Sequence, residues 1–200
     1  MSFHIRGFRP GDEPALAEVC LRTADAGADA TGVFDDDRIW AEVFVLPYVA
    51  RHPDLAFVLE SDVGDVVGYV VATDDTRSFE DWFHDEWWPR RGARWPRPDA
   101  ESTRQDGTLI YAYGRRGGAE PYGTDHPAHL HIDLLPEAQG QGWGRRLIET
   151  VIDELRARGV GGLHLATSDD NARALAFYPR IGFTPLDSHP GVQAFGMTLR

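Results

Sequence analysis

One segment, from Ala128 to Gly159, constrains the fold of this chain more than any other. Residues 128–135 (AHLHIDLL) are typical of a strand, and the glycine-rich loop QGQGWG follows at 139–144. From Gly142 to Arg158 apolar residues recur at helical spacing, and Gly159 is a helix stop signal. The apolar stripe consists of Leu147, Ile148, Val151, Ile152 and Leu155. The segment predicts a strand, a glycine loop and a long amphipathic helix in direct succession.

The rest of the chain adds helices and strands on both sides of this unit. The pattern before it predicts a strand, two helices and a two-stranded hairpin, and the pattern after it predicts a strand, a helix and two strands that are candidates for a terminal hairpin. The expected ranges are 4–8, a helix from Gly11 or Asp12, a helix from Asp35–Asp37, 55–60, 66–73, 163–167, 171–181, 183–187 and 192–199. This order predicts a mixed α/β layer architecture in a single domain covering 1–200.

Residues 77–127 interrupt the pattern and are interpreted as an insert or lid within that domain. The stretch FEDWFHDEWW can form an amphipathic helix, and the remainder is expected to be a long excursion rich in Trp, Arg, acidic residues and proline. Its tryptophans have three candidate roles: packing the excursion onto the sheet, which we favour, walling a substrate pocket, or forming the contact of a homodimer. These tryptophans are Trp82, Trp87, Trp88 and Trp95.

Composition limits the classes of partner. The 200 residues carry a formal net charge of −12, which argues against sequence-independent binding to nucleic acid because such binding requires a basic face, and no nucleic-acid partner is expected. The charge mildly favours a cationic substrate, although keeping the protein soluble is the simpler explanation. Apolar runs such as 66–73 are far shorter than the ~18 residues of a membrane helix, and no secretion signal is visible, so no membrane partner is expected. Cys20 is the only cysteine, consistent with a cytoplasmic location.

The loop at 139–144 has a physical use beyond a tight turn. The first turn of a helix has N–H groups without helical partners and the positive end of the helix dipole, so it attracts an anion. Gly140, Gly142 and Gly144 let the backbone approach a phosphate closely, and Arg145 and Arg146 add positive charge. A pyrophosphate is therefore a natural ligand, with a simple tight turn as the alternative.

A dinucleotide is a rival ligand, because the loop loosely resembles the Gly-x-Gly-x-x-Gly fingerprint. Three features argue against it. Leu147 occupies the place of the last glycine, few residues remain for further βαβ units, and the motif comes late in the chain. Asp169, after the next strand, is the one feature in favour. The sequence therefore favours a pyrophosphate carried by another cofactor.

Two motifs resemble those of the Gcn5-related N-acetyltransferase (GNAT) family. Gln139, Gly142 and Gly144 match its Gln/Arg-x-x-Gly-x-Gly/Ala loop, and NARALAFYPRIGF at 171–183 matches its Asn-x-x-Ala-x-x-Phe-Tyr-x-x-x-Gly-Phe segment. The resemblance covers most of the chain but not 77–127. Within the family, DAGADAT, EWWP and AHLHIDLLP look closest to bacterial acetyltransferases resembling the acetyltransferase-like domain of O-GlcNAcase. The implied fold is a central mixed, mostly antiparallel sheet flanked by helices, with an insert before the acetyl-CoA-binding strand.

The resemblance also implies roles for individual residues, with acetyl-CoA as co-substrate and no metal. The backbone from Gln139 to Arg145 would hold the pyrophosphate, and the strand around Ile132 and Leu134 would pair with the pantetheine arm. Asn171 would bond that arm from the next helix, and Tyr178 would protonate the leaving thiolate. The N–H of Leu134 is a candidate to polarise the thioester carbonyl. The complete donor-site set is Ile132, Leu134, Gln139, Gly140, Gln141, Gly142, Trp143, Gly144, Arg145, Asn171 and Tyr178.

Acetyl transfer to an amine also requires a group that removes a proton. His129, His131 and Asp133 alternate along one strand and should share a face, so one of them is the expected base, a histidine near its usual pKa of about 6.5 being suitable. A metal triad, plain hydrogen bonding within the sheet, and a bulge that changes the face are the alternatives. Direct attack by an amine of a small molecule or a protein is expected, because Cys20 is remote in sequence. A non-catalytic acetyl-CoA-binding or protein-interaction domain is the alternative function.

Overall fold

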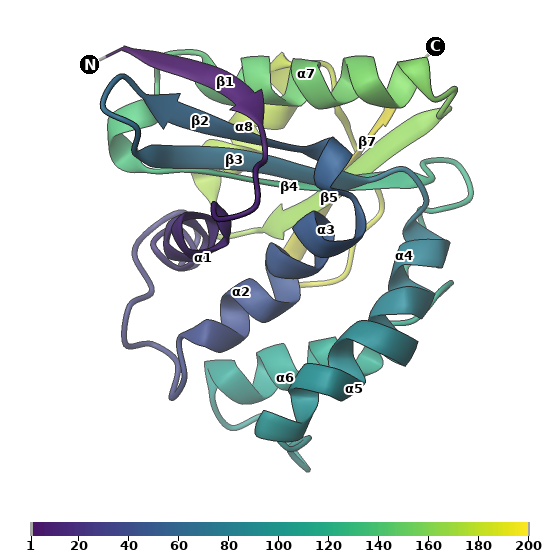
Figure 1. Cartoon of the computed structure of the whole chain (residues 1–200). Coiled ribbons are helices and arrows are strands. Elements are labelled where there is room, and N and C mark those ends of the chain that lie inside the picture. Colours follow the sequence, from purple (N-terminus) through teal and green to yellow (C-terminus); the bar gives the residue numbers. More distant parts are fainter. Residues whose placement is uncertain (1, 200) are drawn as a thin grey trace.

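The computed structural model describes residues 2–199, which fold around one seven-stranded sheet (Figure 1). The strand order is β1-β2-β3-β4-β5-β7-β6, and every neighbouring pair is antiparallel except the parallel pair β4 and β5. The bounds are β1 Phe3–Gly7, β2 Ala56–Ser61, β3 Val66–Thr73, β4 Ala128–Leu134, β5 Gly162–Ser168, β6 Thr184–Pro185 and β7 Val192–Thr198. The expectation of a mixed, mostly antiparallel sheet ending in a hairpin is confirmed.

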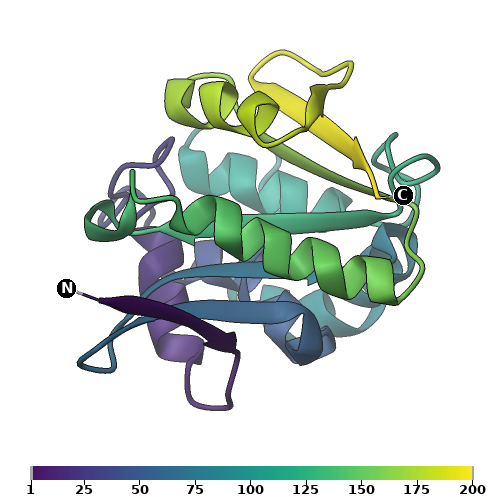
Figure 2. The same ribbon diagram turned by 90° about the horizontal axis from the view of Figure 1, so that it is seen from above.

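Helices cover both faces of the sheet. On one face α7 (Trp143–Ala157) runs across β2, β3 and β4 and buries its whole predicted stripe (Figure 2). On the other face lie α1 (Glu13–Leu21) and α3 (Leu46–Arg51), with α2 (Arg38–Phe44) packed against both of them (Figure 1). The helix α8 (Ala172–Arg180) contacts β6 at the far end of the sheet. The sheet is therefore the middle layer of three, as a mixed α/β pattern predicts.

The second predicted helix is divided in the structure. It ends at Phe44, and α3 begins at Leu46 with Pro47 in its first turn. A proline cannot donate the N–H that a continuous helix requires and it restricts the residue before it, so the chain breaks at Val45. This break turns α3 so that Tyr48 is fully buried beneath the sheet.

The insert is more helical than expected. Its helices are α4 (Thr76–Trp82), α5 (Trp88–Arg91) and α6 (Arg104–Gly114), with a π turn at Phe83–Trp87 and a 3-10 helix at Gly92–Arg94. Further 3-10 helices lie at Pro53–Leu55 and Pro136–Ala138. The sequence reading missed α6, although Thr103 and Asp106 form a reciprocal capping box at its start.

The tryptophans of the insert pack it onto α2. Trp87, Trp88 and Trp95 are buried in a second apolar cluster together with Ile39 and Val43 of α2. The favoured packing role of these three residues is confirmed, but their expected partner, the sheet, is wrong, because they pack against α2 instead. No helix within residues 2–199 has the length and apolar character needed to cross a membrane.

The sheet opens between β4 and β5. These strands pair only at Ala128 with Leu163 and at His129 with His164, whereas β5 pairs with β7 as far as Ser168. The backbone of β4 beyond His129 has no strand partner on this side within residues 2–199. The opening places a bare strand edge beside the loop that leads into α7.

Candidate active site

The loop before α7 presents a series of backbone N–H groups that have no acceptor. Gly140 and Gly142 adopt φ of 73° and 83°, a left-handed conformation that residues with a Cβ rarely adopt. The first regular helical bond of α7 runs from the N–H of Arg146 to the carbonyl of Gly142. The N–H groups of residues 140–145, called here the amide loop, make no hydrogen bond of ordinary geometry within residues 2–199. Together with the helix dipole they form an anion site.

Gln139 fastens the amide loop to its surroundings. Its Nε2 donates to the carbonyl of Leu134 at 2.8 Å, and its Oε1 accepts from Arg173 of α8 at 2.8 Å. Gln141 donates to the carbonyl of Glu137 at 2.7 Å. Both glutamine side chains therefore help to fix the backbone around the amide loop. Three guanidinium groups belong to residues in or next to the amide loop, those of Arg145, Arg146 and Arg173.

The exposed edge of β4 follows from the hydrogen-bond alternation of a strand. The N–H of Leu135 donates to the carbonyl of Val67 of β3 at 2.8 Å. Every second residue of β4, counted back from Leu135, therefore turns its N–H and C=O toward β3. Leu130, Ile132 and Leu134 therefore turn theirs toward the opening beside β5. Pairing of β4 with β3 continues without a bulge from His129 to Leu134. The N–H and C=O of Ile132 and the N–H of Leu134 are thus presented to a ligand lying in the opening.

Tyr178 and Asn171 come from α8 on the other side of the opening. The ring of Tyr178 is 8% exposed and packs against Phe183 and Phe195, while its hydroxyl has no hydrogen-bond partner within residues 2–199. Burial, and then the nearby Asp133 carboxylate, raise the pKa of this hydroxyl above its ordinary value. The Oδ1 of Asn171 caps α8 by accepting from Ala174 at 3.0 Å, and its amide nitrogen makes no side-chain hydrogen bond within residues 2–199.

The three polar residues of β4 share one face, as predicted, but their environments differ. His129 is 7% exposed and both of its ring nitrogens are bonded, Nε2 to Tyr48 at 2.6 Å and Nδ1 to Thr76 at 2.8 Å. Burial and then the neighbouring His164 hold the pKa of His129 well below its usual value. The expectation of a histidine titrating near 6.5 is wrong at this position, because burial disfavours the cation.

His131 and Asp133 face the site with shifted ionisation. The Nε2 of His131 lies 3.0 Å from the hydroxyl of Tyr48, and burial followed by the charge of Arg115 lowers the pKa of His131 to about 3. The expected pKa near 6.5 is therefore wrong for this histidine as well. Burial raises the pKa of Asp133 to about 6, although a hydrogen bond from Tyr69 opposes the shift. A carboxyl group with this pKa can accept a proton near neutral pH.

A buried network that the sequence reading missed supports the two histidines. Arg115, 4% exposed, donates from Nε and Nη2 to Glu80 of α4 at 2.7 Å each, and from Nη1 to the carbonyl of Val43 at 2.7 Å. Its Nη2 also lies 3.2 Å from the hydroxyl of Tyr48. No local pattern identifies Arg115 among the 20 arginines of the chain, because its partners lie far away in sequence.

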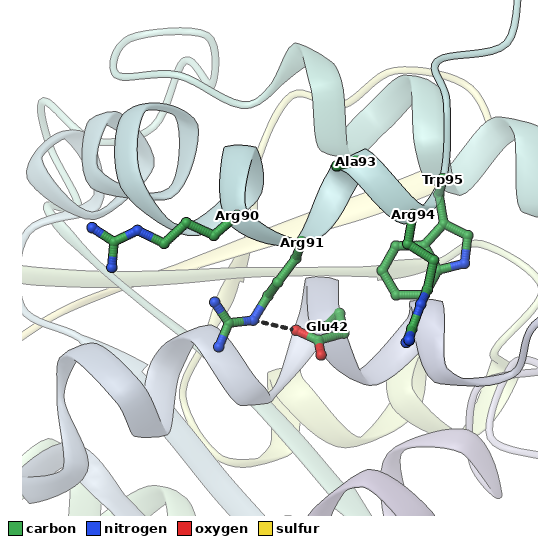
Figure 3. Close-up of a pocket in the computed structure, with 6 residues that line it drawn as sticks. All are labelled: Glu42, Arg90, Arg91, Ala93, Arg94 and Trp95. Carbon is green, nitrogen blue, oxygen red and sulfur yellow. Dashed lines mark ion pairs between the residues drawn. The ribbon is translucent and has the colours of Figure 1, made fainter.

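One hollow in the structure lies away from these residues. It has a volume of about 290 Å³ and is lined by Glu42, Arg90, Arg91, Ala93, Arg94 and Trp95 (Figure 3). Arg91 points toward Glu42 and pairs with it at 2.8 Å, whereas Arg90 extends away. None of the predicted site residues lines this hollow. Between residues 2 and 199 no cluster of three or more His, Cys, Asp or Glu could hold a metal ion.

The sheet that opens beside a loop of unbonded amides defines an α/β protein whose free N–H groups at a helix N-terminus suit an anion. The chain belongs to the acetyltransferase (GNAT) family, whose model matches residues 25–183. It is 36% identical to SsHAT, a solved structure, with a TM-score of 0.92 and 100% of each chain covered. This likeness and the family match confirm the expected fold.

Two curated relatives extend the comparison. The chain is 29% identical to a mycothiol acetyltransferase of Catenulispora acidiphila over 159 residues, 74% of this chain and 40% of the relative. It is 21% identical to the protein O-GlcNAcase of Rattus norvegicus over 183 residues, 90% of this chain and 20% of the relative. The chain thus spans less than half the length of these relatives. The expected resemblance to the acetyltransferase-like part of O-GlcNAcase is confirmed.

Proposed function

We propose that the protein transfers an acetyl group from acetyl-CoA to an amine by direct attack in a ternary complex. The observation that carries the proposal is that three features border the same opening in the sheet. They are the amide loop, the bare edge of β4, and the unbonded hydroxyl of Tyr178 with Asp133 nearby. These suit the pyrophosphate, the pantetheine arm and the thioester in turn. The family match and the relative named mycothiol acetyltransferase support the same activity.

The proposed step assigns one proton to each of two residues. The amine nitrogen attacks the thioester carbonyl carbon, and the C–S bond breaks as the tetrahedral adduct collapses. Asp133 accepts a proton from the amine nitrogen, and Tyr178 donates its hydroxyl proton to the leaving thiolate. The N–H of Leu134 stabilises the oxyanion of the adduct. His129 supports the site rather than acting on the substrate, because both of its ring nitrogens are already bonded.

Gly142→Ala is expected to weaken acetyl-CoA binding about tenfold in a calorimetric titration, which corresponds to about 1.4 kcal/mol. A Cβ at this left-handed position strains the amide loop and stands where the pyrophosphate would lie. Gly159→Ala is the matched control, because Gly159 is also left-handed, at the other end of α7. Equal affinities of the two variants, or no binding by the unchanged protein at millimolar ligand, would contradict the donor site.

The pH dependence of kcat/KM tests Asp133. Because only the carboxylate can accept a proton, kcat/KM corrected for the fraction of neutral amine is expected to rise about tenfold per pH unit below about 6 and to level off above it. His131, with a pKa near 3, stays neutral through this range. Asp133→Asn should abolish this rise of kcat/KM with pH. An unchanged profile in that variant would remove Asp133 from the mechanism.

The acceptor class is tested with a panel of amines on small molecules and on protein N-termini and side chains. Acetylation of any member, detected by release of free thiol, is the expected result. Tight binding of acetyl-CoA with no turnover on the whole panel would instead support the alternative of a non-catalytic acetyl-CoA-binding domain.

A further inference from the structure

The hydroxyl of Tyr48 is the centre of a hydrogen-bond network whose proton positions can be counted. Three groups surround it: Nε2 of His129 at 2.6 Å, Nε2 of His131 at 3.0 Å and Nη2 of Arg115 at 3.2 Å. A phenol offers one hydrogen and two lone pairs, and a guanidinium can only donate. Arg115 therefore occupies one lone pair. One hydrogen and one lone pair remain for the two histidines.

The orientation of His129 is fixed by its other nitrogen. Oγ1 of Thr76 lies 2.7 Å from the carbonyl of Pro127, and a carbonyl only accepts, so the hydroxyl hydrogen of Thr76 lies between these two oxygens. His129 must then donate from Nδ1 to Thr76. Because His129 is buried and neutral, its Nε2 carries no hydrogen and accepts the single hydrogen of Tyr48.

This leaves one arrangement for His131. The remaining lone pair of Tyr48 faces Nε2 of His131, which must therefore carry a hydrogen and donate it. His131 is neutral, so its Nδ1 has a lone pair. Nδ1 makes no hydrogen bond with residues 2–199. It is also not among the side-chain atoms that are buried without a partner, so Nδ1 is accessible to a ligand on this face of β4. Those buried atoms belong to Glu42, Trp88 and His126.

We propose that His129 and Tyr48 hold His131 as the Nε2–H tautomer, with Arg115 and Glu80 fixing the place of the Tyr48 hydroxyl, so that Nδ1 of His131 accepts a hydrogen bond from the N–H of the acceptor amine. This inference deepens the proposed function and rests on it. Asp133 lies two residues further along the same face, so one N–H is held by His131 while Asp133 takes the proton that leaves. The hydrogen bond aligns the nitrogen lone pair with the thioester. Tyr48, Arg115 and Glu80 are positioning residues, and the insert supplies two of them.

The rings next to His131 fit an acceptor entering from this side. Phe44 contacts the edge of the His131 ring, with centroids 5.6 Å apart, and Tyr111 of α6 stacks on Phe44 at 5.6 Å. The side chain of Tyr111 is among the few large apolar groups that are exposed, at 48%. The carbon chain of an amine can pack against the exposed ring of Tyr111 while its nitrogen reaches His131.

Nitrogen-15 NMR of histidine-labelled protein tests the tautomer directly at pH 7, without acetyl-CoA or an amine. His131, assigned by the signal that His131→Asn loses, is expected to show a protonated Nε2 and an unprotonated Nδ1. In Tyr48→Phe the preference should weaken, and signals of both tautomers should appear. A wild-type His131 that is protonated on Nδ1, or on both nitrogens, would overturn the inference. This readout stands even if acetyl-CoA fails to bind, so the two proposals fail separately.

Two variants, whose side-chain amides overlap different nitrogens of the imidazole ring, test the role of Nδ1 in turnover. The side-chain amide of His131→Asn places an acceptor near the Nδ1 position, whereas that of His131→Gln reaches the Nε2 position. Both variants are expected to lower kcat, because His131 contacts the acceptor, but glutamine is expected to lose about tenfold more than asparagine, as expected for one hydrogen bond, with unchanged acetyl-CoA affinity in both. Equal kcat values in the two variants would overturn the assignment. Acetyl-CoA affinity lost in both would indicate a folding defect, and the NMR result then decides.

Discussion

Tyr178→Phe is expected to lower kcat by about 10²–10⁴-fold while leaving acetyl-CoA affinity unchanged. The substitution removes only a hydroxyl that no described residue bonds, and it retains the ring that packs on Phe183 and Phe195. Burial and the Asp133 carboxylate keep this hydroxyl protonated, which is the form that a proton donor requires. Steady-state kinetics with a fixed amine and calorimetry with acetyl-CoA measure the two effects.

Tyr122→Phe is the control for Tyr178→Phe. The hydroxyl of Tyr122 donates to the carbonyl of Asp187 at 2.6 Å on the exposed surface, and no proposed reacting group bonds it. Its removal should leave kcat unchanged. Should Tyr178→Phe turn over as fast as the control, Tyr178 would be a packing residue and water would protonate the thiolate.

The helix α7 and the loop before it could be predicted because their pattern is local. Five apolar residues at helical spacing between Leu147 and Leu155 predict a helix with one buried face, and all five are buried. By contrast, α6 contains Gly107 within a short polar sequence, and its stability comes from Leu109 and Ala112 packing in the second apolar cluster. Tertiary contacts therefore decide a helix whose intrinsic propensity is weak.

The proposed site likewise has features that the sequence could predict and features that it could not. The shared face of His129, His131 and Asp133 follows from strand alternation, and residues of one strand need no tertiary information. Their ionisation does not follow, because it depends on partners that are distant in sequence. Tyr48 lies 81 residues from His129 in the chain, and Arg115 lies 67 residues from Tyr48. A sequence pattern predicts which residues share a face and cannot predict what covers that face.

In the proposed mechanism the insert contributes to chemistry through a buried charge pair rather than through its tryptophans. Trp87, Trp88 and Trp95 hold the insert against α2, which places Arg115 against Tyr48. A variant that removes one partner of the charge pair and a variant that removes both partners should then differ in stability. Both variants should lower turnover.

Glu80→Ala is expected to lower the free energy of unfolding by about 3–5 kcal/mol, because it leaves the guanidinium of Arg115 buried without its counter-charge. For a chain of this length the melting temperature should fall by about 6–20 °C. Glu149→Ala is the control, since it breaks an exposed pair with Arg145 and should cost well under 1 kcal/mol. Thermal and urea unfolding of the three proteins provide the measurement.

The double substitution Glu80→Leu with Arg115→Met separates stability from positioning. Replacing a buried ion pair by apolar residues of similar volume is often neutral or stabilising, so the double variant should unfold near the wild-type temperature. It nevertheless removes the donor that fixes the place of the Tyr48 hydroxyl, so the hydrogen bond that aligns His131 should weaken and kcat should fall. If the double variant is as unstable as Glu80→Ala, the cost comes from lost hydrogen bonds rather than from an uncompensated charge. A double variant that is both stable and fully active would show that the network holds the insert in place without directing the chemistry of β4.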